Sequence, residues 1–348
     1  MNPGAEALAR QLRWQGAGCA RLGAPLYSGL LERCAADVEA GGVIWDLLGE
    51  RADEPGSSAL ALRLLAPVHR LVLEGRLPAL AGHYRPAAGG PADPAAAWPL
   101  FLSAVSDNLE QLRREVARPC QTNDVGRAAA LLGGFMALSN ATGLPLRLLE
   151  IGCSAGLNLR WDRFFYAGAG AAWGDPGSPV RLEDVFLAAP PLQGRPTVIE
   201  RLGCDLEPVD VNDPDSVLRL RSFIWPEHRL RAERLEGAIS IARRVPATVE
   251  RADALEWLSR RLATPVPGRA TVVFHSIFLQ YLPEPARRKV AVLVAEAGKW
   301  TSADAPLAWL RLEPGPGDFE VRLTTWPGGG ERLLATSSPH GSSVRWLG

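Results

Sequence analysis

The stretch Leu148–Arg160, LLEIGCSAGLNLR, decides the fold. A short apolar run ends at an acidic residue, Glu150, and five small residues follow, from Gly152 to Gly156. The residues after them, through Tyr166, have the pattern of a helix. A helix that begins in a loop of small residues offers a ligand unpaired N–H groups and a partial positive charge. The stretch therefore predicts a ligand site at the carboxyl end of a strand.

Alternation of strand and helix continues from this stretch to the C-terminus. Strands are predicted at 146–152, 196–206, 247–255, 270–278 and 305–314. Helices are predicted at 155–166 and 284–298, and one or two helices, broken at Pro226, are predicted at 213–243. A loop is predicted at 168–179, and two final strands at 318–329 and 331–347 enclose a Gly-rich turn. Such alternation predicts an α/β domain with a parallel sheet, and the last two strands predict an antiparallel hairpin at its edge.

The residues before this domain have a helical pattern. Helices are predicted at 7–15, 25–40, 58–75, 100–117 and 122–143, and a Pro/Gly-rich loop is predicted at 85–99. Since 348 residues exceed one average domain, we expect two: an N-terminal helical domain over 1–120 and an α/β domain over 121–348.

Composition excludes several classes of function. Lys+Arg and Asp+Glu both number 38, so no net charge attracts nucleic acid or an anionic membrane. The five cysteines form no C-x-x-C pair and the histidines are not spaced as metal ligands, so we expect no metal. No signal peptide and no apolar run of about 20 residues is present, which predicts a cytoplasmic protein.

The small-residue loop discriminates between two cofactor classes. A dinucleotide fingerprint, G-x-G-x-x-G, would place its third glycine at Leu157, which argues against NAD. The alternative pattern, E/D-x-G-x-G-x-G, matches at Glu150, Gly152 and Gly156, and Ser154 replaces one glycine. This second pattern resembles motif I of the class I, Rossmann-like methyltransferases that use S-adenosylmethionine (SAM).

The resemblance implies a role for each matching position. Glu150 would hold the methionine ammonium, and the loop, Cys153 included, would pass under the methionine. Asp205, with Leu206 beside it, would bind the ribose hydroxyls. Asp253 and Ala254 would meet the adenine, and His275 and Ser276 would contact the cofactor from the fourth strand. Further candidates at the cofactor edge are Thr122, Asn123, Arg127 and Asn158.

Other interpretations stay open for several of these positions. Asp205 follows Gly156 by 205 − 156 = 49 residues, against about 20 in compact nucleotide-binding units, so an insertion around 167–195 is required. Asp205 could simply end its strand, Asp253 could cap the next helix, and His275 could be a packed residue. Arg160 and Asp162 are expected to form a structural or solvated pair.

The chemistry expected of such a site is an in-line methyl transfer. His275 is the first candidate base and His340 the second, while Tyr281 could orient a substrate. The N/D-P-P-Y/F motif of amino-group methylases is absent after the fourth strand, where FHSI stands. Together with the zero net charge, this favours a small-molecule substrate.

The chain also resembles a bacterial family of uncharacterised proteins, DUF2332. The segments QTNDVGR, EIGCSAGLNL, GCDLEPVD, FIWP, HSIFLQYL, WLRLEP and HG..V.W carry this resemblance. It implies a helical N-terminal region joined to a methyltransferase-like domain. We therefore expect a SAM-dependent methyltransferase that acts on a small molecule; the alternatives are another SAM-using transfer, such as aminocarboxypropyl transfer, or a non-catalytic SAM-binding or scaffold protein.

Overall fold

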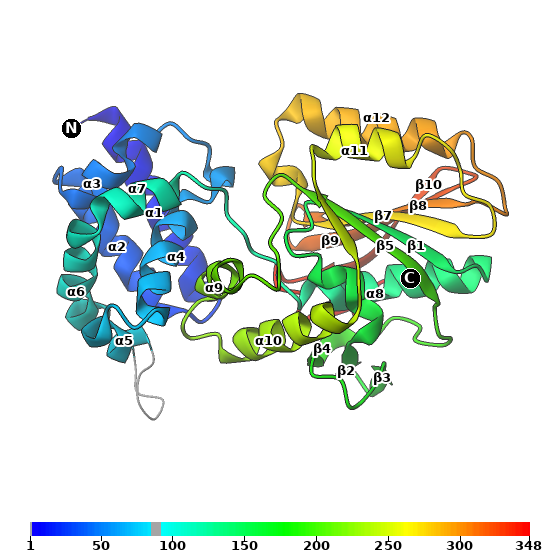
Figure 1. Cartoon of the computed structure of the whole chain (residues 1–348), viewed down its shortest axis with the longest axis horizontal. Coiled ribbons are helices and arrows are strands. Elements are labelled where there is room, and N and C mark those ends of the chain that lie inside the picture. Colours follow the sequence, from blue (N-terminus) through cyan, green and yellow to red (C-terminus); the bar gives the residue numbers. More distant parts are fainter. Residues whose placement is uncertain (1, 85–91) are drawn as a thin grey trace. The chain divides into compact units, whose positions relative to one another are not determined.

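The computed structural model describes residues 2–84 and 92–348. The chain divides into two compact units (Figure 1). The first comprises Met1–Thr122 and Asp213–Ala232, and the second comprises Asn123–Asn212 and Glu233–Gly348. Nothing in the sequence pattern distinguishes residues 213–232 from the neighbouring α/β segments, so their place in the first unit was not predicted.

The first unit is helical. It contains α1 (Pro3–Arg21), α2 (Pro25–Glu39), α3 (Val43–Leu48), α4 (Leu60–Leu73), α5 (Pro78–Tyr84), α6 (Pro94–Asp107), α7 (Leu109–Val116) and α9 (Pro214–Ser222), with short 3-10 turns at 49–51 and 56–58. The helices predicted at 7–15, 25–40, 58–75 and 100–117 are confirmed, and the last of these is divided at Asn108. Helices α3 and α5 were not predicted, because six or seven residues show too little periodicity.

The loop predicted at 85–99 needs correction. Residues 85–91 lie outside the described residues, and α6 begins at Pro94. The Asp93 Oδ1 accepts hydrogen bonds of 3.0 Å from the amides of Ala95 and Ala96. A capping Asp followed by Pro at the first helical position starts a helix, although the same residues also suit a loop.

Residues 213–232 pack into the first unit through several side chains. Helix α9 lies against α4, and the ring of His69 on α4 places Nδ1 3.1 Å from the Ser222 carbonyl. The Glu227 Oε1 accepts from the Leu26 amide at 2.8 Å and so closes the amino end of α2. Trp225 joins the apolar core formed by α1, α2, α4 and α6.

The second unit is built on one large sheet. Its strands are β1 (Leu146–Ile151), β2 (Phe165–Gly168), β3 (Ala171–Trp173), β4 (Arg181–Ala188), β5 (Val198–Asp205), β6 (Thr248–Arg251), β7 (Ala270–Ser276), β8 (Leu307–Pro314), β9 (Phe319–Trp326), β10 (Gly330–Ser337) and β11 (Val344–Trp346). They form an 11-stranded sheet in the order β3-β2-β4-β11-β10-β9-β8-β7-β1-β5-β6. A mixed α/β unit with a large sheet is thus confirmed.

The strands predicted as parallel form one half of this sheet. β6, β5, β1, β7 and β8 are neighbours in that order, and every pair among them is parallel. From β1 the chain proceeds to β5 on one side, and it returns later to β7 on the other. The strand order therefore reverses between β1 and β7. Ligands of open α/β sheets bind at such a switch point, outside the carboxyl ends of the strands.

The C-terminal hairpin is present but does not form the edge of the sheet. β9 and β10 pair antiparallel as predicted, and β9 also pairs with β8. Beyond β10 the sheet continues through β11, which pairs with β4. The expected insertion is confirmed, because β2, β3 and β4 lie between β1 and β5. The loop predicted at 168–179 is wrong at Ala171–Trp173, which form β3; β2 ends at Gly168, the first residue of the predicted loop.

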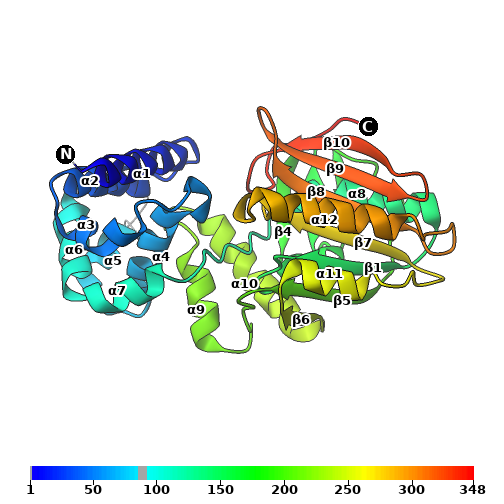
Figure 2. The same ribbon diagram turned by 90° about the horizontal axis from the view of Figure 1, so that it is seen from above.

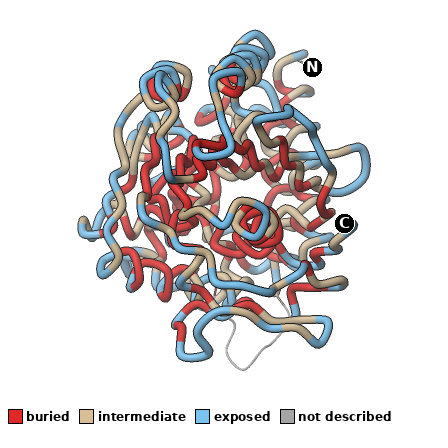
Figure 3. The backbone as a smooth tube through the Cα atoms, turned by 90° about the vertical axis from the view of Figure 1, so that its right-hand side faces the viewer, coloured by how far each residue is buried: buried red, intermediate tan, exposed pale blue. Residues whose placement is uncertain are grey.

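Helices cover both faces of the sheet (Figure 2). α11 (Ala254–Arg261) and α12 (Glu284–Gly298) cover one face, over a core that includes Leu149, Val273, Trp257 and Val294. α8 (Arg127–Thr142) lies on the opposite face against β7, β8, β9 and β10. Most of α8 is buried. Figure 3 colours the backbone by burial and shows buried segments in the interior and exposed segments at the surface. α10 (Arg229–Arg244) belongs to this unit from Glu233 onward.

Candidate functional site

The loop of small residues adopts an unusual backbone conformation. Gly152, Ser154 and Gly156 have φ angles of +63°, +54° and +62°. Glycine adopts this region without strain, whereas a serine there costs about 1–2 kcal/mol. A Cβ added to Gly152 would lie 2.2 Å from a carbon of the Phe278 ring. Small residues are thus required partly by backbone geometry and partly by contact with Phe278, two reasons that the sequence did not reveal.

The segment after the loop is not the predicted α-helix. Residues Leu157–Arg163 form a 3-10 run, interrupted by non-helical angles at Arg160. Its first amide, Leu157 N, donates to Asn123 Oδ1 at 3.0 Å, and Gly156 N donates to the Cys153 carbonyl at 2.7 Å. Because these amides have protein partners and the run is short, the expected ligand site at a helix N-terminus is not formed here.

Asp205 orders this loop. It ends β5, and its Oδ2 accepts from the Ser154 amide at 2.9 Å. Its Oδ1 accepts from the Glu207 amide, also at 2.9 Å. The candidate site residues Asp205 and Ser154 are therefore brought together, and these two hydrogen bonds give Asp205 a role in loop structure.

Glu150 is the central carboxyl group of the site. It lies at the end of β1, is 3% exposed, and its Oε2 is buried with no hydrogen-bond partner among residues 2–84 and 92–348. Burial raises the pKa of Glu150 to about 8; Asp205 adds to the rise, while Arg160 and Arg127 oppose it. Glu150 is therefore mostly a neutral carboxylic acid at pH 7.

Two further buried oxygens belong to the same loop region. In the described part of the chain, Ser154 Oγ and Asn158 Oδ1 are buried without a partner. The Asn158 Nδ2 group donates to the Asp124 carbonyl at 3.2 Å, which fixes the amide on one side only. Buried polar atoms almost always have a protein, water or ligand partner. Three unpartnered oxygens within nine residues therefore indicate a place where another molecule completes the structure.

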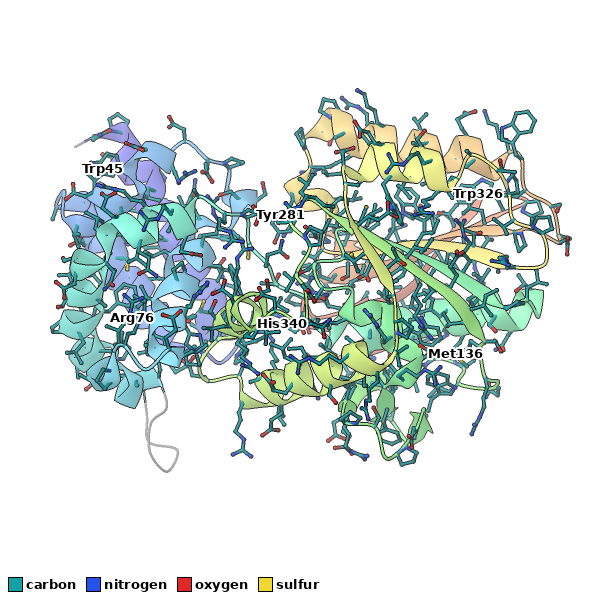
Figure 4. All side chains as sticks on the ribbon, in the orientation of Figure 1. Trp45, Arg76, Met136, Tyr281, Trp326 and His340 are labelled. Atoms are coloured by element: carbon teal, nitrogen blue, oxygen red, sulfur yellow. The ribbon has the colours of Figure 1, made fainter. Side chains whose placement is uncertain are left out.

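The segment before α8 contacts this loop. Asn123 binds Leu157 N, and the Arg127 guanidinium donates to the carbonyls of Ser276 and Pro339, both at 3.2 Å. The His340 Nδ1 lies 2.6 Å from the Asp124 Oδ2 (Figure 4 labels His340). Residues expected separately near 123–127, at 276 and at 340 thus converge. Thr122 is the last residue of the Met1–Thr122 segment of the first unit, whereas the loop belongs to the second unit.

His275 is held on both sides of its ring. It is fully buried, with Nδ1 2.7 Å from Glu313 Oε1 and Nε2 3.1 Å from the Trp309 indole Nε1. An indole N–H only donates, so Nε2 carries the lone pair and Nδ1 carries the proton. Neither ring nitrogen can accept a substrate proton in this arrangement, which therefore corrects the choice of His275 as first base.

The other predicted residues make their contacts with groups other than Glu150. Asp253 is exposed and caps α11, accepting from the amides of Leu255 and Glu256 at 2.9 and 3.2 Å. Ala254 packs into the core under α11, Leu206 is exposed, and Tyr281 lies half-exposed on a 3-10 turn at Leu279–Tyr281. Asp162 pairs with Arg201 at 2.7 Å rather than with Arg160, which donates to the Gly156 carbonyl at 2.6 Å.

Sequence reasoning missed Phe278, Trp309 and Glu313. Phe278 contacts Gly152, and Trp309 and Glu313 hold His275. The last two lie within WLRLEP, one of the segments that carried the family resemblance, but a strand segment gives no sign of which partner its polar residues meet.

The comparisons identify the family of this chain. Residues 9–346 match the family model of an uncharacterised protein conserved in bacteria, DUF2332, and the chain belongs to that family. No curated protein and no solved structure matches the chain. None of the helices in the described ranges has the length and apolar character needed to cross a membrane.

Proposed function

We propose that the second unit binds SAM at the carboxyl ends of β1 and β5 and transfers its methyl group to a small molecule. The observation that carries this proposal is the buried Glu150, whose Oε2 has no partner among the described residues and which lies at the switch point of the sheet. A neutral buried acid at this position can become a carboxylate when a cation arrives.

The residues of the loop fit SAM. Its ammonium and sulfonium both carry positive charge, and Glu150, once ionised, can form an ion pair with one of them. Ser154 Oγ and Asn158 Oδ1 can accept N–H or O–H groups of a polar ligand. Asp205, at the end of the adjacent strand, is the predicted acceptor for ribose hydroxyls. Leu157, at the third fingerprint position, disfavours NAD.

Methyl transfer divides the work between ligand and protein. SAM supplies a methyl group on a sulfonium leaving group. The protein has to hold both reactants in line, exclude water and accept a proton from an O–H or N–H nucleophile. His275 is committed to Glu313 and Trp309. His340 is the better candidate, because Asp124 accepts from Nδ1 and orients the ring so that Nε2 is the basic atom.

A non-catalytic ligand-binding protein is the second candidate. The observation that favours it is the locked ring of His275, which lies where the first base was expected. This candidate shares the Glu150 site and predicts binding without turnover.

Calorimetric titration with SAM, S-adenosylhomocysteine and NADH tests the proposal. We expect micromolar binding of the first two and no binding of NADH. Glu150→Gln removes the titratable group and should abolish binding, whereas Glu183→Gln, on the exposed side of β4, should leave it unchanged. Binding of NADH alone, or of no nucleoside by folded protein freed of co-purified ligand, would refute the proposal.

A further inference from the structure

Glu313 is a second carboxyl group at the same edge of the sheet, and 16% of its side chain is exposed. It lies near the end of β8, and its Oε1 accepts from His275 Nδ1 at 2.7 Å and from the amides of Phe278 and Leu279 at 2.9 and 3.1 Å. Its other oxygen, Oε2, is buried and has no partner in residues 2–84 and 92–348. One oxygen thus takes three donors and the other takes none.

The hydrogen bonds define the charge of this group. Because Trp309 donates to His275 Nε2, His275 is neutral and donates from Nδ1 to Glu313. Burial acts to raise the pKa of Glu313, whereas the hydrogen bond from His275, the attraction of that ring when it is protonated, and the hydrogen bonds from the two amides lower the pKa below its usual value. Glu313 is therefore a carboxylate at neutral pH, unlike Glu150.

An ionised oxygen without a donor is costly inside a protein, and each such atom needs a partner from outside the chain. On the same face of β8, the Nη2 group of Arg311 is paired with Glu331, and the guanidinium stacks on the Trp309 ring at 4.0 Å. Its Nε is buried without a partner among the described residues, so this cation forms its ion pair with Glu331.

The turn beside Glu313 is strained. Ile277 has a φ of +53°, an outlier for a β-branched residue. The turn is held by the bond from Ile277 N to the Leu312 carbonyl at 2.8 Å and by the two amides that bind Glu313. Strain of this kind, of order 1–3 kcal/mol, persists where the surroundings over-determine the backbone, commonly at functional sites.

We propose that Glu313 Oε2 is the ligand-facing atom of a second subsite, which binds a cationic N–H group, an ammonium or an amidinium, of the methyl acceptor. A carboxylate whose other oxygen is already saturated is suited to a charge-assisted bond with such a group. β8 is separated from β1 by β7 alone, so the subsite shares the sheet edge with Glu150. Phe278, whose amide binds Glu313, also contacts Gly152 in the loop that follows Glu150. The statement that this cationic group belongs to the methyl acceptor rests on the proposed function. The preference of Glu313 for a cation is independent of the proposed function.

His275 reports on this subsite, because its Nδ1 binds the same carboxylate. We would label the histidine rings with 15N and titrate the full chain with methylammonium, acetamide and acetate at constant ionic strength. Methylammonium should shift the His275 ring signals in a saturable way, and acetamide and acetate should not. Glu313→Gln should lose at least tenfold in methylammonium affinity, while Glu183→Gln, on the exposed side of β4, should behave as wild type.

Several outcomes would overturn the proposal. Equal responses to the three probes, no response, or an unchanged response in Glu313→Gln would each do so. The comparison of probes uses the wild-type chain and stays decisive if the variant fails to fold. A high-resolution structure with a water bonded to Oε2 and to two other protein atoms, unchanged in methylammonium, would show a hydration site instead.

The same samples separate this proposal from the proposed function. Titration with S-adenosylhomocysteine tests the Glu150 site, and we expect Glu313→Gln to retain that binding. A wild-type chain that responds to methylammonium but binds no S-adenosylhomocysteine would refute the SAM proposal and leave the Glu313 subsite standing.

Discussion

Glu150 and Glu313 show how two carboxyl groups of one sheet edge come to differ in charge. Both have one oxygen without a partner in the described part of the chain. Glu313 receives three hydrogen bonds on its other oxygen, which lower its pKa, whereas burial dominates at Glu150 and raises its pKa to about 8. Hydrogen-bond donors, rather than burial alone, decide the ionisation of each group.

The raised pKa of Glu150 predicts a pH-dependent stability. The native state holds this proton more tightly than the unfolded chain, so the contribution of Glu150 is greatest below about pH 4.5 and is lost as the pH rises to about 8. Gln does not titrate. The free energy of unfolding of Glu150→Gln, relative to that of wild type, should therefore rise by several kcal/mol between pH 5 and pH 8, because each pKa unit is worth about 1.4 kcal/mol.

Urea unfolding at pH 5, 6.5 and 8 measures this difference. Glu183→Gln serves as the control and should show no comparable trend. A free-energy difference between Glu150→Gln and wild type that stays constant with pH would mean that Glu150 is ionised in the unliganded protein.

Gly152 and Phe278 are predicted to be energetically coupled. Gly152→Ala adds a Cβ at 2.2 Å from the Phe278 ring, in a backbone conformation with a φ of +63°. In a Phe278→Ala background the clash disappears, and the cost should fall to about 1–2 kcal/mol of backbone strain. A double-mutant cycle by urea unfolding measures the coupling; an equal cost in both backgrounds would contradict the contact.

The sequence indicated some of these residues for identifiable reasons. Glu150, Asp205 and Asp253 stand at strand ends in a recognisable order, and the segment before α8 contains polar residues next to the loop. Phe278 and Glu313, which are in contact, lie 313 − 278 = 35 positions apart in the sequence. Phe278 and Gly152 lie 278 − 152 = 126 positions apart. No local pattern could reveal either contact.

At the scale of elements, local propensity was sufficient for long segments and insufficient for short ones. β1, β5, β7 and β8 have apolar runs that predicted strands, and α12 has helical periodicity. The segment 157–163 has the same apolar spacing, yet side-chain bonds from Asn123 and Arg160 hold it as a 3-10 run. Strands β2 and β3 have four and three residues, and only their pairing within the sheet defines them.

The turn that contains His340 is held against the start of α8 by two glycines. A Cβ on Gly341 would lie 2.0 Å from the Gly126 carbonyl oxygen, and Gly341 has a φ of +70°. Gly341→Ala should therefore destabilise the protein by more than about 2 kcal/mol, from strain and backbone displacement together.

Gly330→Ala is the matched control, because its Cβ would meet no atom within 4 Å. It should change the stability by less than about 0.5 kcal/mol in thermal or urea unfolding. Equal effects of the two substitutions would mean that the 338–342 turn does not pack against α8 as described.

At the scale of the whole chain, the family match over residues 9–346 includes both units. The helical unit is completed by residues 213–232, which the chain reaches between β5 and β6. A sequence pattern read segment by segment assigns them to the α/β unit, because packing against α4 is a tertiary property. The proposed location of the ligand site, in contrast, lies at the carboxyl end of a strand of the parallel sheet, and the alternation of strands and helices predicted that sheet.

The central claim is that a cationic ligand binds beside Glu150 and ionises it. Calorimetric titration with S-adenosylhomocysteine at pH 7, in two buffers with different enthalpies of ionisation, measures the protons released on binding. We predict a release of about 0.9 proton per site, because a carboxyl group with a pKa of about 8 is mostly protonated at pH 7 and would be ionised in the complex. Glu150→Gln should bind weakly and release none. Tight binding without proton release, or no binding by the folded chain, would contradict the account.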